Sequence, residues 1–130
     1  MPIFALKLIE QVKGKIKFYK LERDKKCEFD EFCNLLEGKK EESKLRSIFA
    51  IMDSVSNLNR LPKTKFRELE GRSPDDKIKE YEIKKKPYRV YLFKDSEGNI
   101  VVSGSIKGNQ KKDIKRFRAI KIEYLKSKEL

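Results

Sequence analysis

Apolar and polar residues alternate through most of residues 78–107, and two turn signals divide this stretch into three runs. Because neighbouring side chains of a strand point to opposite faces, the alternation predicts three strands in succession. The turns are expected at Lys85-Lys86-Pro87, where proline fixes the backbone, and at residues 95–99. These strands are the expected centre of the fold.

The two faces of these strands are predicted to differ in character. The apolar face is expected to carry Tyr88, Val90, Leu92, Ile100, Val102 and Ile106, and to lie buried under helices. The polar face is expected to carry Glu82, Lys84, Arg89, Ser103, Ser105 and Lys107. This open cationic face is the candidate site.

Helical spacing appears twice before these strands. Apolar residues at i, i+3, i+4 and i+7 predict a short helix that ends near Gly38. A second helix is predicted from about Glu41, and the short connection between the two makes them an antiparallel hairpin laid against the sheet. The stripes are Phe29, Phe32, Cys33 and Leu36 in the first helix, and Leu45, Ile48, Phe49, Met52 and Val55 in the second.

The two ends of the chain complete an α+β domain over residues 1–130. Strand-like runs at residues 3–12 and 15–21, around Gly14, predict an amino-terminal β-hairpin. Residues 63–76 are less regular, with a short anchored segment and a polar loop. A last helix is predicted over residues 110–126. The sequence therefore predicts one domain with helices on one face of a mostly antiparallel twisted sheet.

Charge narrows the range of partners. Lysine and arginine number 33 against 21 acidic residues, a formal net charge of +12, which favours a polyanion such as nucleic acid or an acidic protein. The two cysteines and the lack of histidine favour reduced thiols in a cytoplasmic protein and predict no metal site and no cofactor. No apolar run reaches membrane-spanning length, so no membrane association is expected.

Several sequence segments, in order, carry a resemblance to a known family. They are IKFYK, the helix segment FDEF, KFRELEG, IKEYEIK, PYRVYLF and IVVSGSIKGNQKK. The chain resembles the RelE/ParE toxin superfamily over residues 15–124, closest in style to the phage Gp49-like or HigB-like branch. The resemblance implies a RelE-like fold and a toxin of a type II toxin–antitoxin pair. Such toxins are usually endoribonucleases that cut mRNA at the ribosome, so the implied partners are a cognate antitoxin, mRNA and the ribosome.

The residues of the polar face suit such chemistry. RNA can be cut without a metal when the ribose 2′-hydroxyl attacks the adjacent phosphorus, and cations must then stabilise the developing negative charge. Arg89 offers a planar fork for two phosphate oxygens, and Lys84 and Lys107 add charge from adjoining strands. Glu82, or a lysine with a lowered pKa, would accept the 2′-hydroxyl proton. The resemblance implies an arginine in a functional role at position 89 and basic residues near positions 84 and 107.

The lack of histidine departs from many relatives, which have one on the third strand where this chain has Ser103-Gly104-Ser105. The leaving oxygen would take its proton from Lys107, Lys111 or a tyrosine such as Tyr91 or Tyr124, or else catalysis would depend mostly on substrate orientation and charge. Simpler interpretations compete: Arg89 and Glu82 as an exposed ion pair, and the strand tyrosines as core residues instead of base-stacking groups. A ParE-type gyrase poison and a non-catalytic nucleic-acid-binding protein are the alternative functions. Nucleic-acid contacts on the last helix are expected from Lys111, Lys112, Lys115, Arg116 and Arg118.

Overall fold

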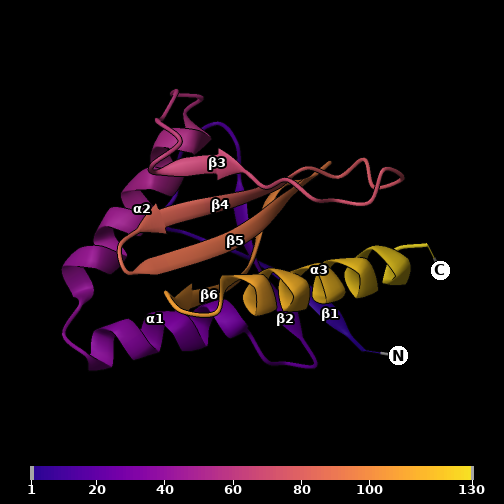
Figure 1. The fold of residues 1–130 in the computed structure, drawn as a ribbon, viewed down its shortest axis with the longest axis horizontal. Helices are drawn as coiled ribbons and strands as arrows, with labels where there is room; N and C mark the ends of the chain where they lie inside the picture. Colours follow the sequence, from indigo (N-terminus) through magenta and orange to yellow (C-terminus); the bar gives the residue numbers. More distant parts are fainter. Residues whose placement is uncertain (1, 130) are drawn as a thin grey trace.

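The structure, a computed structural model, describes residues 2–129 and forms an open six-stranded sheet with helices on both of its faces (Figure 1). The helices are α1 (Glu28–Gly38), α2 (Glu42–Ser56) and α3 (Gln110–Ser127). The strands are β1 (Phe4–Leu8), β2 (Phe18–Arg23), β3 (Phe66–Glu68), β4 (Glu80–Lys85), β5 (Tyr88–Asp95) and β6 (Gly98–Ile106). None of the helices in this described part is long and apolar enough to cross a membrane.

The strand order across the sheet is β1-β2-β6-β5-β4-β3. Every neighbouring pair is antiparallel except β2 and β6, which run parallel. The predicted three central strands are confirmed, with turns at the two expected breaks. The amino-terminal hairpin is also confirmed, although its strands are joined by a longer loop than a tight turn at Gly14. The sheet is therefore mostly antiparallel, as the sequence predicts.

The two predicted helices form a hairpin against one face of the sheet. Phe29, Phe32 and Leu36 of α1 pack with Ile48 and Met52 of α2 in one core. That core also contains Val90 and Leu92 of β5. The stripes found in the sequence therefore identify the buried faces of α1 and α2, with Cys33, Phe49 and Val55 partly buried at their rim.

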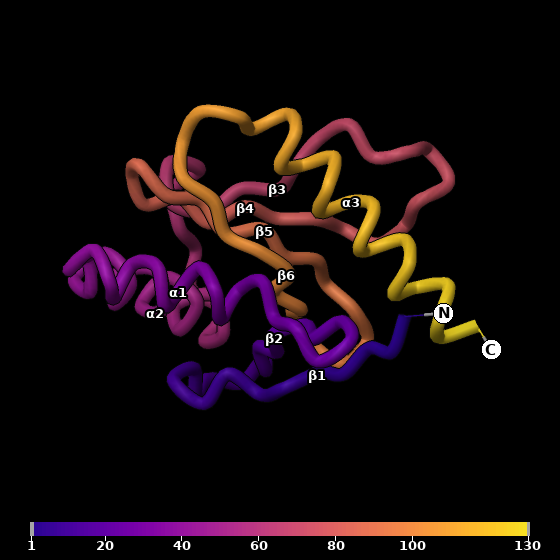
Figure 2. The backbone as a smooth tube through the Cα atoms, turned by 90° about the horizontal axis from the view of Figure 1, so that it is seen from below, coloured from indigo at the N-terminus to yellow at the C-terminus, as the bar shows by residue number. Residues whose placement is uncertain are grey.

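The prediction that all helices share one face is wrong, because α3 covers the opposite face (Figure 2). Phe117, Ile120 and Tyr124 of α3 pack with Tyr91 and Phe93 in a second core. Consecutive positions from Val90 to Phe93 are therefore buried on alternate faces. A strand covered on both faces is apolar without alternation, and this run in β5 has that composition.

The predicted apolar face of β6 is also partly wrong. The pairing of β5 with β6 shifts register at a bulge between Tyr91 and Leu92, so Leu92 lies opposite Val101. Val101 consequently packs under the helical hairpin, while Ile100 and Val102 pack under α3. One extra residue reverses the face of the side chains on one side of the bulge. Ile106, expected to be buried, is 48% exposed.

A buried ionic cluster fastens α3 to β4 and the preceding loop. Lys121 of α3 is buried, with 1% of its surface exposed. Its ammonium donates to Asp76 Oδ2 at 2.6 Å, to the Ile78 carbonyl at 2.7 Å and to Glu80 Oε2 at 3.0 Å. Arg118 Nε donates to Glu80 Oε1 at 2.8 Å. The positions of Lys121 and Arg118 are thus set by a fully buried carboxylate.

Candidate active site

The candidate site is organised around Glu82 of β4, whose side chain is fully buried. Its Oε1 accepts hydrogen bonds from Arg67 Nε at 2.7 Å and from Arg89 Nη1 at 3.0 Å. Its Oε2 accepts from Gln110 Nε2 at 2.9 Å. The sheet register explains this convergence, because Arg67 lies directly opposite Glu82 and Arg89 lies opposite Lys84. The carboxylate therefore fixes two guanidinium groups from the strands on either side of it.

Two lysines add positive charge around this centre. Lys84 Nζ lies 3.9 Å from Glu82 Oε1, and burial together with the charge of Arg67 lowers the pKa of Lys84. Lys107 follows β6, and its backbone N–H donates to the Pro87 carbonyl at 2.7 Å, which ties it to the turn between β4 and β5. Three cationic side chains thus lie within 4.0 Å of one carboxylate, and Lys107 adds a fourth positive charge nearby, so the site has an excess of positive charge.

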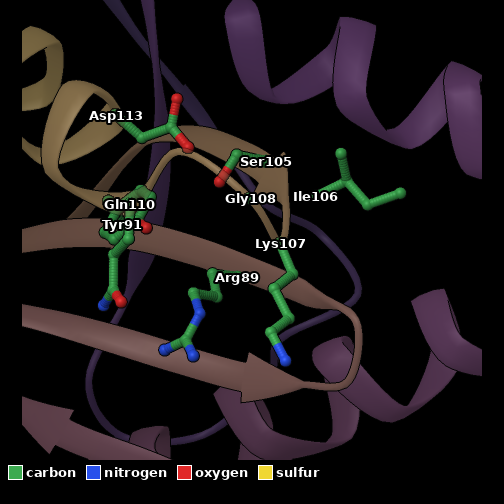
Figure 3. A pocket seen from close by; sticks show the side chains of 8 residues that line it. All are labelled: Arg89, Tyr91, Ser105, Ile106, Lys107, Gly108, Gln110 and Asp113. Carbon is green, nitrogen blue, oxygen red and sulfur yellow. The ribbon is translucent and has the colours of Figure 1, made fainter.

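Two hollows lie beside these cations. The first, of about 200 Å³, is lined by Arg89, Tyr91, Ser105, Lys107, Gln110 and Asp113, among others (Figure 3). Arg89 and Lys107 extend their charged groups in the same direction from neighbouring strands in this view. The second, of about 160 Å³, is lined by Lys84, Pro87, Tyr88, Arg89 and Lys107. Arg89 and Lys107 line both hollows, so a ligand in either one meets the same two cations.

Arg89 retains donors for a ligand. Its side chain is 24% exposed, and only its Nη1 donates to Glu82. Among residues 2–129, no protein group accepts a hydrogen bond from its Nε or Nη2. The ion pair with Glu82 expected as the simpler interpretation does exist, but it lies half-buried beside a hollow instead of on a solvated face. Such a pair holds the guanidinium in place while leaving part of its fork available.

Two of the three strand tyrosines considered as base-stacking groups, Tyr88 and Tyr91, are core residues. Tyr91 is fully buried and stacks on Phe117 of α3 with ring centroids 5.8 Å apart. Tyr88 is buried against Phe32. Tyr81 is half-buried and stacks on Phe66 at 5.0 Å. Aromatic side chains in strands thus follow their usual packing role in this protein.

The hydroxyl of Tyr91 is nevertheless unusual. It is buried, and no described residue forms a hydrogen bond with it. Burial raises its pKa, and the neighbouring Ser105 hydroxyl opposes that shift. Tyr124, the other tyrosine expected as a proton donor, lies in the core between Phe4 and Phe93, away from the hollows. Tyr124 is therefore not placed to act on a bound substrate.

The cations of α3 divide into two groups. Lys111, Lys112 and Lys115 are exposed, and the described residues give them no ion-pair partner. Arg116 forms two hydrogen bonds to the Glu28 carboxylate, at 3.2 and 2.7 Å, and Arg118 donates to Glu80 and to the Glu70 carbonyl. The structure therefore leaves the three lysines available for a partner and engages the two arginines within the protein.

Sequence reasoning missed Arg67 and Gln110. Arg67 lies in a short edge strand, Phe66–Glu68, within the segment interpreted as irregular. The order apolar, polar, polar, apolar from Phe66 to Leu69 does not alternate, so periodicity alone does not identify this strand. Gln110 begins α3, and only the docking of this helix over the sheet brings its amide to Glu82. No pattern in the sequence encodes that contact.

Comparison with known proteins gave no match: no family model, no curated protein and no solved structure is significantly similar to this chain. The α+β architecture agrees with the predicted class. The resemblance to RelE-like toxins stays a prediction, and the function has to be argued from the site itself.

Proposed function

We propose that this protein is a metal-independent endoribonuclease that cuts mRNA at the ribosome, as the toxin of a type II toxin–antitoxin pair. The observation that carries the proposal is the placement of Arg89. A buried carboxylate fixes its guanidinium between Lys84 and Lys107, beside a hollow large enough for a nucleotide fragment. Pre-positioned cations of this kind stabilise the charge of a phosphoryl transition state.

Arg89 would donate from its free nitrogens to the non-bridging phosphoryl oxygens as the 2′-hydroxyl attacks. Lys107, which lines both hollows, would add charge and protonate the departing 5′-oxygen. In this step a bond forms between the 2′-oxygen and phosphorus, and the bond between phosphorus and the 5′-oxygen breaks. The products are a 2′,3′-cyclic phosphate and a 5′-hydroxyl end.

Lys84 is the better candidate for the proton acceptor. The Glu82 carboxylate is fully buried and already accepts hydrogen bonds from Arg67, Arg89 and Gln110, so a substrate hydroxyl has no access to it. Lys84, whose pKa is lowered, holds a larger neutral fraction at working pH than an ordinary lysine. Glu82 is then a positioning residue for Arg89, not the base.

This assignment predicts the pH dependence of cleavage. Only the neutral form of Lys84 accepts a proton. Because the pKa of Lys84 is lowered, this neutral form becomes populated at a lower pH than in an ordinary lysine. The rate should therefore rise with pH from about 7 toward 10, after subtraction of uncatalysed hydrolysis. Lys84→Arg, which stays protonated, should give a low and flat profile. A parent rate that falls over the same range would assign Lys84 to the acid role instead.

Lys111, Lys112 and Lys115 on α3 are proposed to contact the phosphate backbone. Replacing any one of them by alanine should weaken RNA binding evenly across sequences and reduce the slope of log affinity against log salt by about one. Affinity measured over a salt series provides the value. Arg118→Ala, tested alongside, should lower the stability of the fold and leave the salt slope nearly unchanged, because the Arg118 side chain is bound to Glu80. Unchanged slopes in all three lysine variants would remove α3 from the interface.

The same cations suggest how the toxin is silenced. An acidic segment of a cognate antitoxin would fit over the hollow that Lys84, Arg89 and Lys107 line, where it would compete directly with phosphate. The sequence and the net charge of +12 support this proposal.

One observation favours a second function. The carboxylate nearest the cations is fully hydrogen-bonded and the chain has no histidine, so the site offers few ordinary proton-transfer groups. A protein on this fold that binds nucleic acid or gyrase without cutting RNA is the alternative. Expression in a bacterial host, with growth and mRNA cleavage on programmed ribosomes followed in parallel, separates the two. Growth arrest without cleavage would support the binding function. The absence of both growth arrest and cleavage would contradict the proposal that the protein is a toxin.

A further inference from the structure

The outer edge of the sheet at β1 is an unpaired strand edge. β1 stands first in the strand order, pairs with β2 alone, and lies at the margin of the molecule with no other described element outside it (Figure 2). It pairs with β2 over all 5 of its residues, Phe4–Leu8, and contains neither proline nor a bulge. Proteins usually shield such an edge, because its free backbone groups can pair with another strand. The opposite edge strand, β3, has only 3 residues and is a poorer template.

The hydrogen bonds at the two ends of β1 show which of its backbone groups are free. The Ile3 carbonyl accepts from the Asp24 N–H at 2.7 Å, and the Ile9 N–H donates to the Phe18 carbonyl at 2.9 Å. Alternate residues of an antiparallel strand point their N–H and C=O groups to the same side, so the odd-numbered residues of β1 bond to β2. The even-numbered residues point these groups away from β2, and they are Phe4, Leu6 and Leu8.

The side chains leave apolar surface at both ends of this edge. Leu8 is 47% exposed, and Ile3, just before the strand, is 76% exposed. Phe4 and Leu6 are partly buried on the α3 side of the sheet, where Phe4 packs edge-to-face on Tyr124 at 5.6 Å. Because side chains two residues apart share a face, Leu8 extends the row of Phe4 and Leu6 without cover of its own. The edge therefore combines free backbone groups with uncovered apolar side chains.

A second copy of β1 fits this edge in an antiparallel register centred on Leu6. When Leu6 lies opposite Leu6 of the second copy, Phe4 lies opposite Leu8 of that copy, and the whole strand pairs. The free N–H and C=O groups of the two strands then meet directly, which allows about six hydrogen bonds. Apolar side chains lie opposite apolar ones, and Lys7 lies opposite Ala5, so no two like charges face each other.

The same register gives a partner to Lys7, the one charged residue of β1. On β2, the neighbour of Lys7 is Lys20, which is bound to Asp30 at 2.7 Å, and the neighbour of Ala5 is Glu22. The described residues give neither Lys7 nor Glu22 an ion pair. Lys7 of the second copy lies beside Ala5, and the short alanine leaves it room to reach Glu22 on the next strand, about 5 Å further on. The two-fold axis repeats this ion pair.

We propose that β1 pairs with β1 of a second copy of this chain, which gives a two-fold dimer with one sheet continuous across both copies. The inference does not depend on the proposed function, because the candidate site lies on β4, β5 and the end of β6, away from β1. One short strand pair buries less than the roughly 1,200 Å² of a stable interface, and both copies are strongly basic. The dimer is therefore weak and forms at high concentration.

Sedimentation equilibrium of the full chain from about 10 μM to 1 mM, at about 0.15 M salt, tests for this dimer. The average mass should rise from that of one chain toward twice that value. Amide hydrogen exchange should slow with concentration at Leu6 and Leu8, whose N–H groups point outward, and stay constant at Ala5 and Lys7. Single chains at every concentration would overturn the proposal and leave this edge to a strand of another protein. A dimer without new protection in β1 would also overturn it.

A proline at position 8 tests the strand edge. Leu8→Pro removes an N–H that points away from β2, and its ring blocks the approach of a second strand. The variant should fold, because no hydrogen bond to β2 is lost, and it should stay a single chain over the whole concentration range. Leu8→Ala is the matched control, since it keeps the N–H and should still dimerise, at most about 10-fold more weakly. Dimerisation of folded Leu8→Pro like that of the parent would contradict pairing through β1.

Charge reversal tests the register. Lys7→Glu and Glu22→Lys should each weaken the dimer about 10-fold, because both ion pairs of the dimer become repulsive. The chain with both substitutions has opposite charges at these positions again and should dimerise like the parent. Lys7 is exposed and Glu22 is half-buried, so the variants should fold. A double variant as weak as the single ones, or single variants that dimerise like the parent, would overturn the two-fold pairing.

Discussion

Arg89→Ala is expected to lower the rate of RNA cleavage by about 10²–10³-fold, the usual cost of removing one pre-positioned donor to a transition state. Arg89 lies between both hollows and has nitrogens free for phosphoryl oxygens. Arg89→Lys should restore little, because an ammonium cannot supply the planar fork. Cleavage rates on programmed ribosomes, measured for each purified variant, give the comparison.

The matched control is Arg46→Ala on the exposed surface of α2, which removes one arginine charge away from the site. It should cut RNA at the parental rate. Glu82 keeps Arg67 and Gln110 as partners in Arg89→Ala, so that variant should remain folded. A folded Arg89→Ala protein with parental activity would show that phosphoryl charge is stabilised elsewhere.

Lys121→Met is expected to lower the free energy of unfolding by about 3 kcal/mol, because it leaves the buried carboxylate of Glu80 with one charged partner instead of two. Methionine keeps most of the side-chain volume, so the loss reports the missing charge and hydrogen bonds more than a cavity. Asp76 and the Ile78 carbonyl lose their donor as well. Urea unfolding at neutral pH measures the change.

Lys126→Met serves as the control, because Lys126 is exposed on the same helix and should change stability by less than about 0.5 kcal/mol. Equal stabilities for the two variants would mean that the ionic cluster does not hold α3 against the sheet.

The central strands and the helical hairpin were predictable because their signals are local. Alternation through β4 and the first residues of β5 and the stripe of Phe29, Phe32 and Leu36 depend on neighbouring residues alone. The bulge opposite Leu92 left no signal, and it changed the face of Val102. The face that α3 covers was predicted wrongly, because β5 was expected to have one buried face. Its apolar run is buried on both faces. Long-range packing decided both points.

The candidate site also combines features that local sequence patterns predict with features that depend on long-range packing. Glu82, Lys84 and Arg89 share a face because strand periodicity places them there, so their proximity was predictable. The role of Glu82 was not, because its burial depends on Gln110 of α3 and on Arg67 of an edge strand. Lys121 likewise looks like a surface residue in the sequence, since a lysine is seldom fully buried unless several acceptors meet it. Those acceptors come from another part of the chain.

The most direct test of the endoribonuclease proposal is the chemistry of the RNA ends. A labelled RNA is incubated with the protein on programmed ribosomes in one reaction, and without ribosomes in excess EDTA in another. Each reaction is compared with one on the same RNA carrying a 2′-deoxy residue at the cut position. We expect 2′,3′-cyclic phosphate and 5′-hydroxyl ends from the first RNA and no cut at that position in the second. Ends with a 3′-hydroxyl and a 5′-phosphate, or intact RNA under both conditions, would contradict the proposal.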